Sequence, residues 1–196
     1  GLNNANGDLS SAGALTLTTR ELNNAKGSIL ADEAAVMAAS IENDGGTIAT
    51  VGRLSIQSSG DLSNRRGSVA AGDALELSTR SLTDNAAGRI VAVAGDAALR
   101  FQDDASTAGG VVASPGRLSV KAVGLDNRDA TMRGNRIELD VASLNNASGT
   151  ISSVDALTVH AGRIANTSGT LLGGEIHAEV GQVVNIQGRI AATGST

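Results

Sequence analysis

The residues best suited to chemistry gather in one stretch, RIVAVAGDAALRFQDDASTAGG, at positions 89–110. It contains the adjacent carboxylates Asp103 and Asp104 and the only aromatic residue of the chain, Phe101. Clustered carboxylates could supply the acid and the base that cleave a glycosidic bond, or could hold a cation. The alternative, which we favour, is that the two carboxylates lie in a solvated loop that follows a slightly wider coil. Phe101 would then fill the interior of that wider coil.

Two histidines and two asparagines are the other candidates. His160 follows Val159 and His177 lies between Ile176 and Ala178, so alternation predicts that both point outward, and a metal site would need more ligands. Asn146 and Asn166 each begin an Asn-X-Ser sequence that matches the glycosylation sequon, but both also fit a turn. We therefore predict no catalytic, cofactor-binding or metal-ligating residue, and no cofactor.

Composition excludes several classes of protein. The net charge of −5 and the near absence of aromatic residues, at 1%, argue against nucleic-acid binding. No cysteine is present, so no disulfide or thiolate chemistry is available. No apolar run approaches the 18 residues or so that a membrane-spanning helix needs. The chain opens within a repeated pattern, GLNN, without a signal peptide, which indicates a fragment of a longer protein.

Any such site would be positioned by a repeat of about 20 residues. The stretch LNNANGDLSSAGALTL at 2–17 returns almost unchanged as LNNASGTISSVDALTV at 144–159. Each copy opens on an aliphatic or small residue, the anchor, which gives nine full copies and the start of a tenth. The anchors are Leu2, Leu22, Ile41, Leu62, Leu82, Ala105, Leu125, Leu144, Ile164 and Val183.

Further columns recur at fixed distances from the anchor. Two residues on stand Asn4, Asn24, Asn43, Asn64, Asp84, Thr107, Asn127, Asn146, Asn166 and Asn185. A column of small residues follows, with Gly7, Gly27, Gly46, Gly67, Gly88, Gly110, Ala130, Gly149, Gly169 and Gly188. An aliphatic residue comes two places later, then an L-x-L pair such as Leu157 and Val159. We expect the glycines to supply positive φ or close backbone approach, and the asparagines to form turns or a ladder.

The columns predict strands rather than helices, because their internal period is two. Residues 31–42, ADEAAVMAASIE, have good helix propensity, but Val36 and Ile41 lie in register with the other copies, which favours strand. Three short strands per copy make one triangular coil. Parallel connections are nearly always right-handed. The sequence thus predicts an all-β, right-handed parallel β-helix of nine to ten coils, formed by residues 1–196 as a single unit.

These columns also carry a resemblance to a known family. The stretches LNNANGDLSSAGALTL, LSNRRGSVAAGDALEL, LNNASGTISSVDALTV and IANTSGTLLGGEIHAEV resemble the filamentous haemagglutinin repeats of two-partner-secreted exoproteins. That group includes filamentous adhesins and the CdiA-type contact-dependent growth inhibition toxins of Gram-negative bacteria. The resemblance implies a β-helical fibre on the cell surface, an outer-membrane transporter as secretion partner, and a receptor on a host or neighbouring cell.

Two functions remain open. The first is a non-enzymatic rod that presents a distal adhesive or toxin domain. The second is a β-helical carbohydrate-active enzyme, or a passenger domain that binds a surface ligand. The enzyme would need carboxylates in a cleft, whereas the loops here are short. Arginines near the L-x-L pairs, interspersed with acids, indicate a mixed solvated face, and they are Arg20, Arg53, Arg80, Arg100, Arg117 and Arg163. We also expect unpaired strand edges at the two ends to associate end to end.

Overall fold

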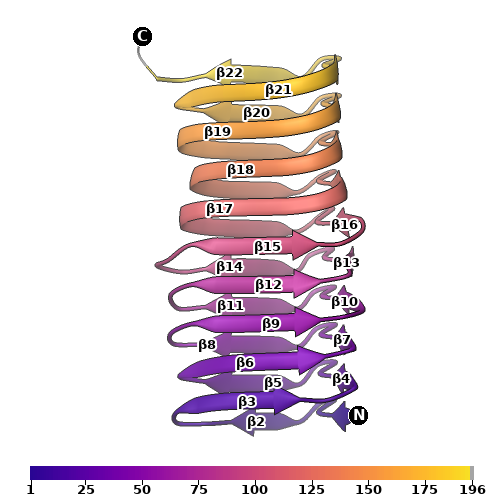
Figure 1. Cartoon of the computed structure of the whole chain (residues 1–196), viewed down its shortest axis with the longest axis vertical. Coiled ribbons are helices and arrows are strands. Elements are labelled where there is room, and N and C mark those ends of the chain that lie inside the picture. The colour runs from indigo at the N-terminus through magenta and orange to yellow at the C-terminus, as the bar shows by residue number, and fades with distance from the viewer. Residues whose placement is uncertain (195–196) are drawn as a thin grey trace.

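A computed structural model describes residues 1–194 as a single solenoid of about 10 turns built from 22 β-strands (Figure 1). As the chain climbs from the N-terminus to the C-terminus, its front strands run left to right and its rear strands return right to left. This sense of winding is right-handed. Every pairing between coils is parallel, as between Leu2 and Leu22 or between Leu171 and Ile190. The predicted right-handed parallel β-helix is confirmed.

Each coil has three sides. The anchor face carries the short strands with the anchors: β1 Leu2–Asn3, β4 Glu21–Asn23, β7 Ser40–Glu42, β10 Asp61–Ser63, β13 Ser81–Asp84 and β16 Ala105–Ser106. The glycine face carries the strands that follow each glycine: β2 Asp8–Ser10, β5 Ser28–Ala31, β8 Thr47–Thr50, β11 Ser68–Ala71, β14 Arg89–Ala92, β20 Thr170–Gly173 and β22 Arg189–Ala192. The L-x-L face carries β3 Ala14–Thr18, β6 Glu33–Ala38, β9 Leu54–Ser58, β12 Leu75–Thr79 and β15 Ala97–Phe101.

The upper coils differ from the three short strands expected. There β17 Val111–Asp126, β18 Thr131–Asn145 and β19 Thr150–Ala165 each run through all three faces, and β21 Glu175–Val184 covers two. At the corner between the glycine face and the L-x-L face, the register shifts between Ser114 and Arg117 and between Gly134 and Arg136. These shifts are β-bulges, which bend a strand without ending it. The lower coils turn the same corner through short bends instead.

The core is a stack of aliphatic side chains in register. Ile151 pairs with Met132 below and Leu171 above, and its side chain is fully buried. Residues 31–42 form β6 and β7, with Val36 and Ile41 buried, so the register predicted their structure correctly and helix propensity did not. Within residues 1–194 there is no helix that could span a membrane.

The glycine column is explained by close contact. A Cβ built on Gly27 would lie 2.1 Å from the backbone oxygen of Asn4 in the coil below, and one on Gly169 would lie 2.0 Å from that of Asn146. Positive φ, however, occurs one residue earlier, at Lys26 and Ser168 among others. The prediction of close approach is therefore confirmed, whereas left-handed backbone belongs to the preceding column.

One column assignment was wrong. The residue stacked on Asn64 is Asn85 and not Asp84, because Leu62 pairs with Leu82 while Ser63 pairs with Asp84, which leaves Thr83 as an extra residue in a bulge. Asp84 instead accepts a hydrogen bond from the backbone amide of Ala86. The spacing of three residues between asparagine and glycine, as in Asn64 to Gly67, would have identified Asn85 before Gly88.

Candidate functional site

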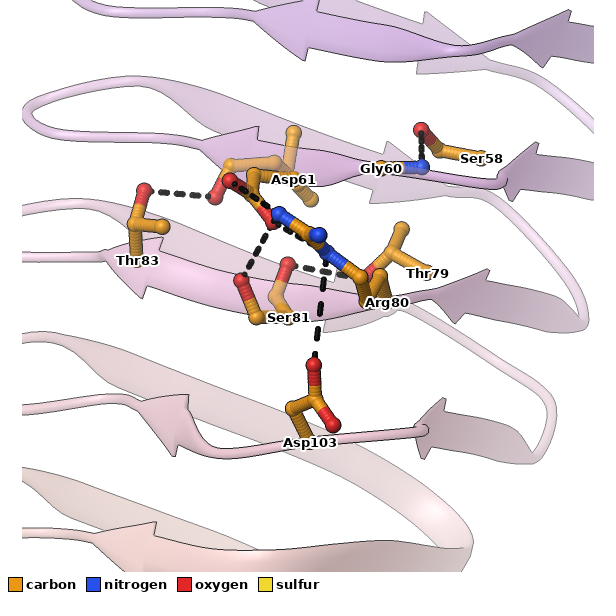
Figure 2. Close-up of polar contacts among 9 residues, drawn as sticks. Ser58, Gly60, Asp61, Thr79, Arg80, Ser81, Thr83 and Asp103 are labelled. Atoms are coloured by element: carbon orange, nitrogen blue, oxygen red, sulfur yellow. Dashed lines mark hydrogen bonds and ion pairs between the residues drawn. The ribbon is translucent and has the colours of Figure 1, made fainter.

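Asp103 and Asp104 lie at the corner where the L-x-L face meets the anchor face. Figure 2 shows Asp103 below the guanidinium of Arg80, with 4.0 Å between Arg80 Nε and Asp103 Oδ2. Arg80 is held more closely by Asp61 of the preceding coil, which is drawn above it in Figure 2, with Arg80 Nη2 2.8 Å from Oδ1 and 3.0 Å from Oδ2. Hydrogen bonds from Arg80 and then from Ser81 hold the pKa of Asp61 below its usual range. A carboxylate stabilised in this way is a poor general acid.

Asp104 lies at the edge of a hollow on the anchor face. Its Oδ1 accepts the backbone N–H of Gly124 at 2.9 Å, and both residues line an open depression of about 470 Å³. Hydroxyl, amide and carboxylate groups line it, including Ser106, Asp126 and Asn145. Asp126 is paired with Arg128, which holds the pKa of Asp126 below its usual range. The hollow therefore offers polar groups to a ligand, and its Asp126 carboxylate is a poor candidate for a general acid.

Phe101 is in the core. It pairs with Thr79 in the coil below, and only 5% of its surface is exposed. The anchor four residues later, Ala105, is the smallest in the anchor column. Phe101 is therefore a core residue, as predicted, and its ring is not available to stack on a sugar.

The two histidines are surface residues, as predicted. The side chain of His160 is 53% exposed and its Nε2 lies 3.8 Å from Glu179 Oε2, while His177 is 67% exposed and lies 3.3 Å from Glu175 Oε2. They do not stack, because His177 pairs with Thr158 and His160 pairs with Glu179. Within residues 1–194, no three His, Cys, Asp or Glu side chains converge closely enough to hold a metal ion.

The sequon asparagines are structural. Asn146 and Asn166 are fully buried, and Asn146 Nδ2 donates to Asn166 Oδ1 at 2.7 Å. A buried amide with this partner cannot receive a glycan, so their role as turn residues is confirmed. Of the six arginines named from the sequence, two pair with acidic residues within residues 1–194: Arg80 with Asp61 at 2.8 Å and Arg117 with Glu138 at 2.6 Å.

The comparison with family models agrees with this geometry. A model described as haemagglutinin repeat matches residues 1–97, 67–137 and 133–195, which together cover nearly the whole chain. Searches of curated proteins and of solved structures found no match.

Proposed function

Because this chain belongs to the haemagglutinin repeat family, whose members are structural segments of secreted or cell-surface filamentous adhesins, we propose that it acts as a rod. In this proposal residues 1–196 are a non-enzymatic spacer. The spacer holds a distal adhesive or toxin domain away from the producing cell.

The continuous register of the coils is the observation that supports a spacer most directly. Aliphatic columns and backbone ladders pass from Leu9 and Ile29 in the first coils to Leu171 and Ile190 in the last. Each coil adds about 4.8 Å of length and a further set of ladder hydrogen bonds. Length and stiffness thus grow with coil number, which is what a spacer requires.

A non-enzymatic role is supported by the state of the carboxylates. Asp61 and Asp126 are each paired with an arginine, and Asp104 accepts a backbone amide. The hollow beside Asp104 is open and has no walls that would exclude water from a reacting substrate.

The proposal extends to secretion and partners. The repeat columns resemble those of exoproteins that cross the outer membrane of Gram-negative bacteria through a dedicated transporter, and we assign this chain the same route and surface location. A receptor on a host or neighbouring cell would be met by the distal domain. Exposed aromatic side chains, which commonly anchor protein interfaces, are missing from this sequence.

Removing a whole coil tests the spacer role. Deleting residues 144–163 joins Ser143 to Ile164 and keeps every column in register, since Leu144 pairs with Ile164. In the full-length exoprotein, this deletion should shorten the rod by about 4.8 Å and leave activity at the distal tip nearly unchanged. Deleting 144–153 removes half a coil, joins Ser143 to Val154, and should misfold.

The two deletions together separate folding from function. A folded whole-coil variant that has lost distal activity would mean that this stretch carries a specific site, and the spacer role would be wrong. A half-coil variant as stable as the parent would mean that the coil register itself is wrong.

A further inference from the structure

A ladder of asparagines, buried in all but its first and last members, runs along the corner between the anchor face and the glycine face. In each step the side-chain amide Nδ2 donates to Oδ1 of the asparagine in the next coil at 2.7 Å. The steps are Asn4 to Asn24, Asn24 to Asn43, Asn43 to Asn64, Asn64 to Asn85, Asn127 to Asn146, Asn146 to Asn166, and Asn166 to Asn185. The same Nδ2 usually also reaches two backbone oxygens, as Asn64 does with Gly67 O and Arg89 O.

The ladder breaks between Asn85 and the next coil. Thr107 stands in the asparagine column there, and its hydroxyl lies within hydrogen-bonding distance of Asp126 O and Asn127 Oδ1 in the coil above. Asn85 is fully buried, and its Nδ2 has no hydrogen-bond partner. A buried donor left unpaired costs free energy, because it has given up water without replacing it.

Backbone pairing is also thinnest at this level of the anchor face. Strands β13 and β16 are paired through Leu82 and Ala105 alone, and the bond from Leu82 N to Asp104 O is long, at 3.3 Å. One coil higher, the anchor face pairs through both Ala105–Leu125 and Ser106–Asp126. The small anchor Ala105 also buries less apolar surface than the leucine or isoleucine of most other coils.

A second substitution accompanies the break. Ala130 occupies the glycine column in the coil above Thr107. At an ordinary level such as Gly149, a Cβ would lie 2.1 Å from Asn127 O, 2.6 Å from Asn146 Oδ1 and 3.0 Å from Asn127 Nδ2. Thr107 has no side-chain amide, so it removes the contact with Nδ2 at the Ala130 level. The two contacts with oxygen atoms remain there, and a shift of the local backbone must relieve them. Thr107 and Ala130 therefore form a matched pair, and restoring the asparagine alone would bring its amide against the alanine methyl.

We propose that the level between Asn85 and Thr107 is a built-in opening point of the rod. In a stacked repeat, each coil contacts only its neighbours, so the weakest interface opens first when the whole is heated or pulled. This level lacks the hydrogen bond between side-chain amides that joins most of the other coils. Its two anchor-face strands are paired through one residue pair, and its anchor is the small residue Ala105. Coils below and above it would then separate as two cooperative units.

Hydrogen exchange followed by mass spectrometry tests the proposal on the chain of residues 1–196. Amides of segments 82–88 and 105–111 should exchange at least about tenfold faster than the equivalent segments 144–149 and 164–169. The double variant Thr107→Asn/Ala130→Gly restores the ladder and should slow exchange at 82–88 about tenfold. Thr107→Asn alone should slow exchange less than the double variant does, because the methyl group of Ala130 would crowd the restored amide.

A matched control moves the break elsewhere. Asn146→Thr with Gly169→Ala copies the pair into a continuous part of the ladder, and should speed exchange at 125–130 and 144–149 at least about tenfold. Uniform exchange along the parent rod, or a restored ladder that leaves 82–88 unchanged, would overturn the proposal. The comparison of the parent with the restored variant does not depend on this control, so it can be interpreted even if the control variant does not fold.

Discussion

At the scale of single residues, the glycine column is governed by contact between coils. Gly169→Ala would place a methyl group 2.0 Å from Asn146 O, so backbone must shift, and we expect a loss of about 1–3 kcal/mol or more. A Cβ added at Gly13 would meet no atom within 4 Å, so Gly13→Ala should stay within about 0.5 kcal/mol of the parent. Urea unfolding followed by circular dichroism measures both. Equal losses would show that the glycines serve flexibility instead.

The aliphatic column gives a second residue-scale prediction. Ile151 is fully buried, whereas Val154, three residues later, is 74% exposed at a corner. Ile151→Ala removes atoms from a close-packed stack and should cost about 2–5 kcal/mol, while Val154→Ala should cost less than about 0.5 kcal/mol. Thermal or urea melts of the two variants check the register, because a one-residue slip would reverse their order.

Ion pairing on the surface predicts a small pH dependence. The pKa of Asp61 is lowered by Arg80 and Ser81, so its contribution to stability is present above the unfolded pKa of about 3.9 and is lost as pH falls through the lower folded value. Asp61→Asn should therefore be slightly less stable than the parent at pH 7 and should lose less stability between pH 4 and pH 2. Urea melts of the parent and the variant at pH 7, pH 4 and pH 2 measure these differences in stability. A parent and variant with parallel pH profiles would contradict it.

At the scale of elements, the asparagine ladder should contribute more than any surface pair. Asn146 donates to Asn166 Oδ1, Gly149 O and Thr170 O and accepts from Asn127. Asn146→Ala removes these bonds and leaves Asn127 Nδ2 unpaired, with an expected cost of about 3–5 kcal/mol.

The neighbouring Asn145 supplies the control for the ladder. Its side chain accepts one hydrogen bond, from Ala147 N at 3.2 Å, and it is only partly buried. Asn145→Ala should cost about 0.5–1.5 kcal/mol. If the two variants melted together, the ladder would contribute no more than an ordinary turn.

Strand positions were predictable because the anchor, aliphatic and L-x-L columns repeat whatever the local propensity. Residues 31–42 show this, since their register placed Val36 and Ile41 correctly in the core. The bulge at Thr83 was missed because one extra residue shifts the asparagine but not the anchor. The continuous strands β17 to β19 were also missed, since bent and bulged corners use the same residue types, such as valine at Val51 and Val154 and glycine at Gly52 and Gly116. The break at Thr107 depends on the contacts of Asn85 and becomes apparent only when the coils are stacked.

At the scale of the whole molecule, stability is distributed over the interfaces between coils. A single coil buries too little apolar surface to offset its own ordering entropy, so each coil depends on its neighbours. The same dependence leaves the first and last coils half-satisfied. Three apolar side chains are exposed near the C-terminal end: Val183 at 49%, Ile186 at 58% and Ile190 at 39%. Val183 belongs to the anchor column and Ile190 to the aliphatic column, and both columns are buried in the middle of the rod. At the end of the asparagine ladder, Asn185 Nδ2 donates a hydrogen bond to Gly188 O within the same coil.

These ends predict head-to-tail association of a chain that consists of residues 1–196. Stacking one rod on another would place Asn185 Nδ2 near Asn4 Oδ1 and Ile190 against Leu9, which continues both columns. Such a contact does not close on itself, so the average mass in sedimentation should rise steadily with concentration. Ile190→Lys would bury a charge on stacking and should keep the chain monomeric. Val154→Lys adds the same charge on the side of the rod and should still associate. A parent that stays monomeric at millimolar concentration, or two lysine variants that behave alike, would show that the end coils do not template one another.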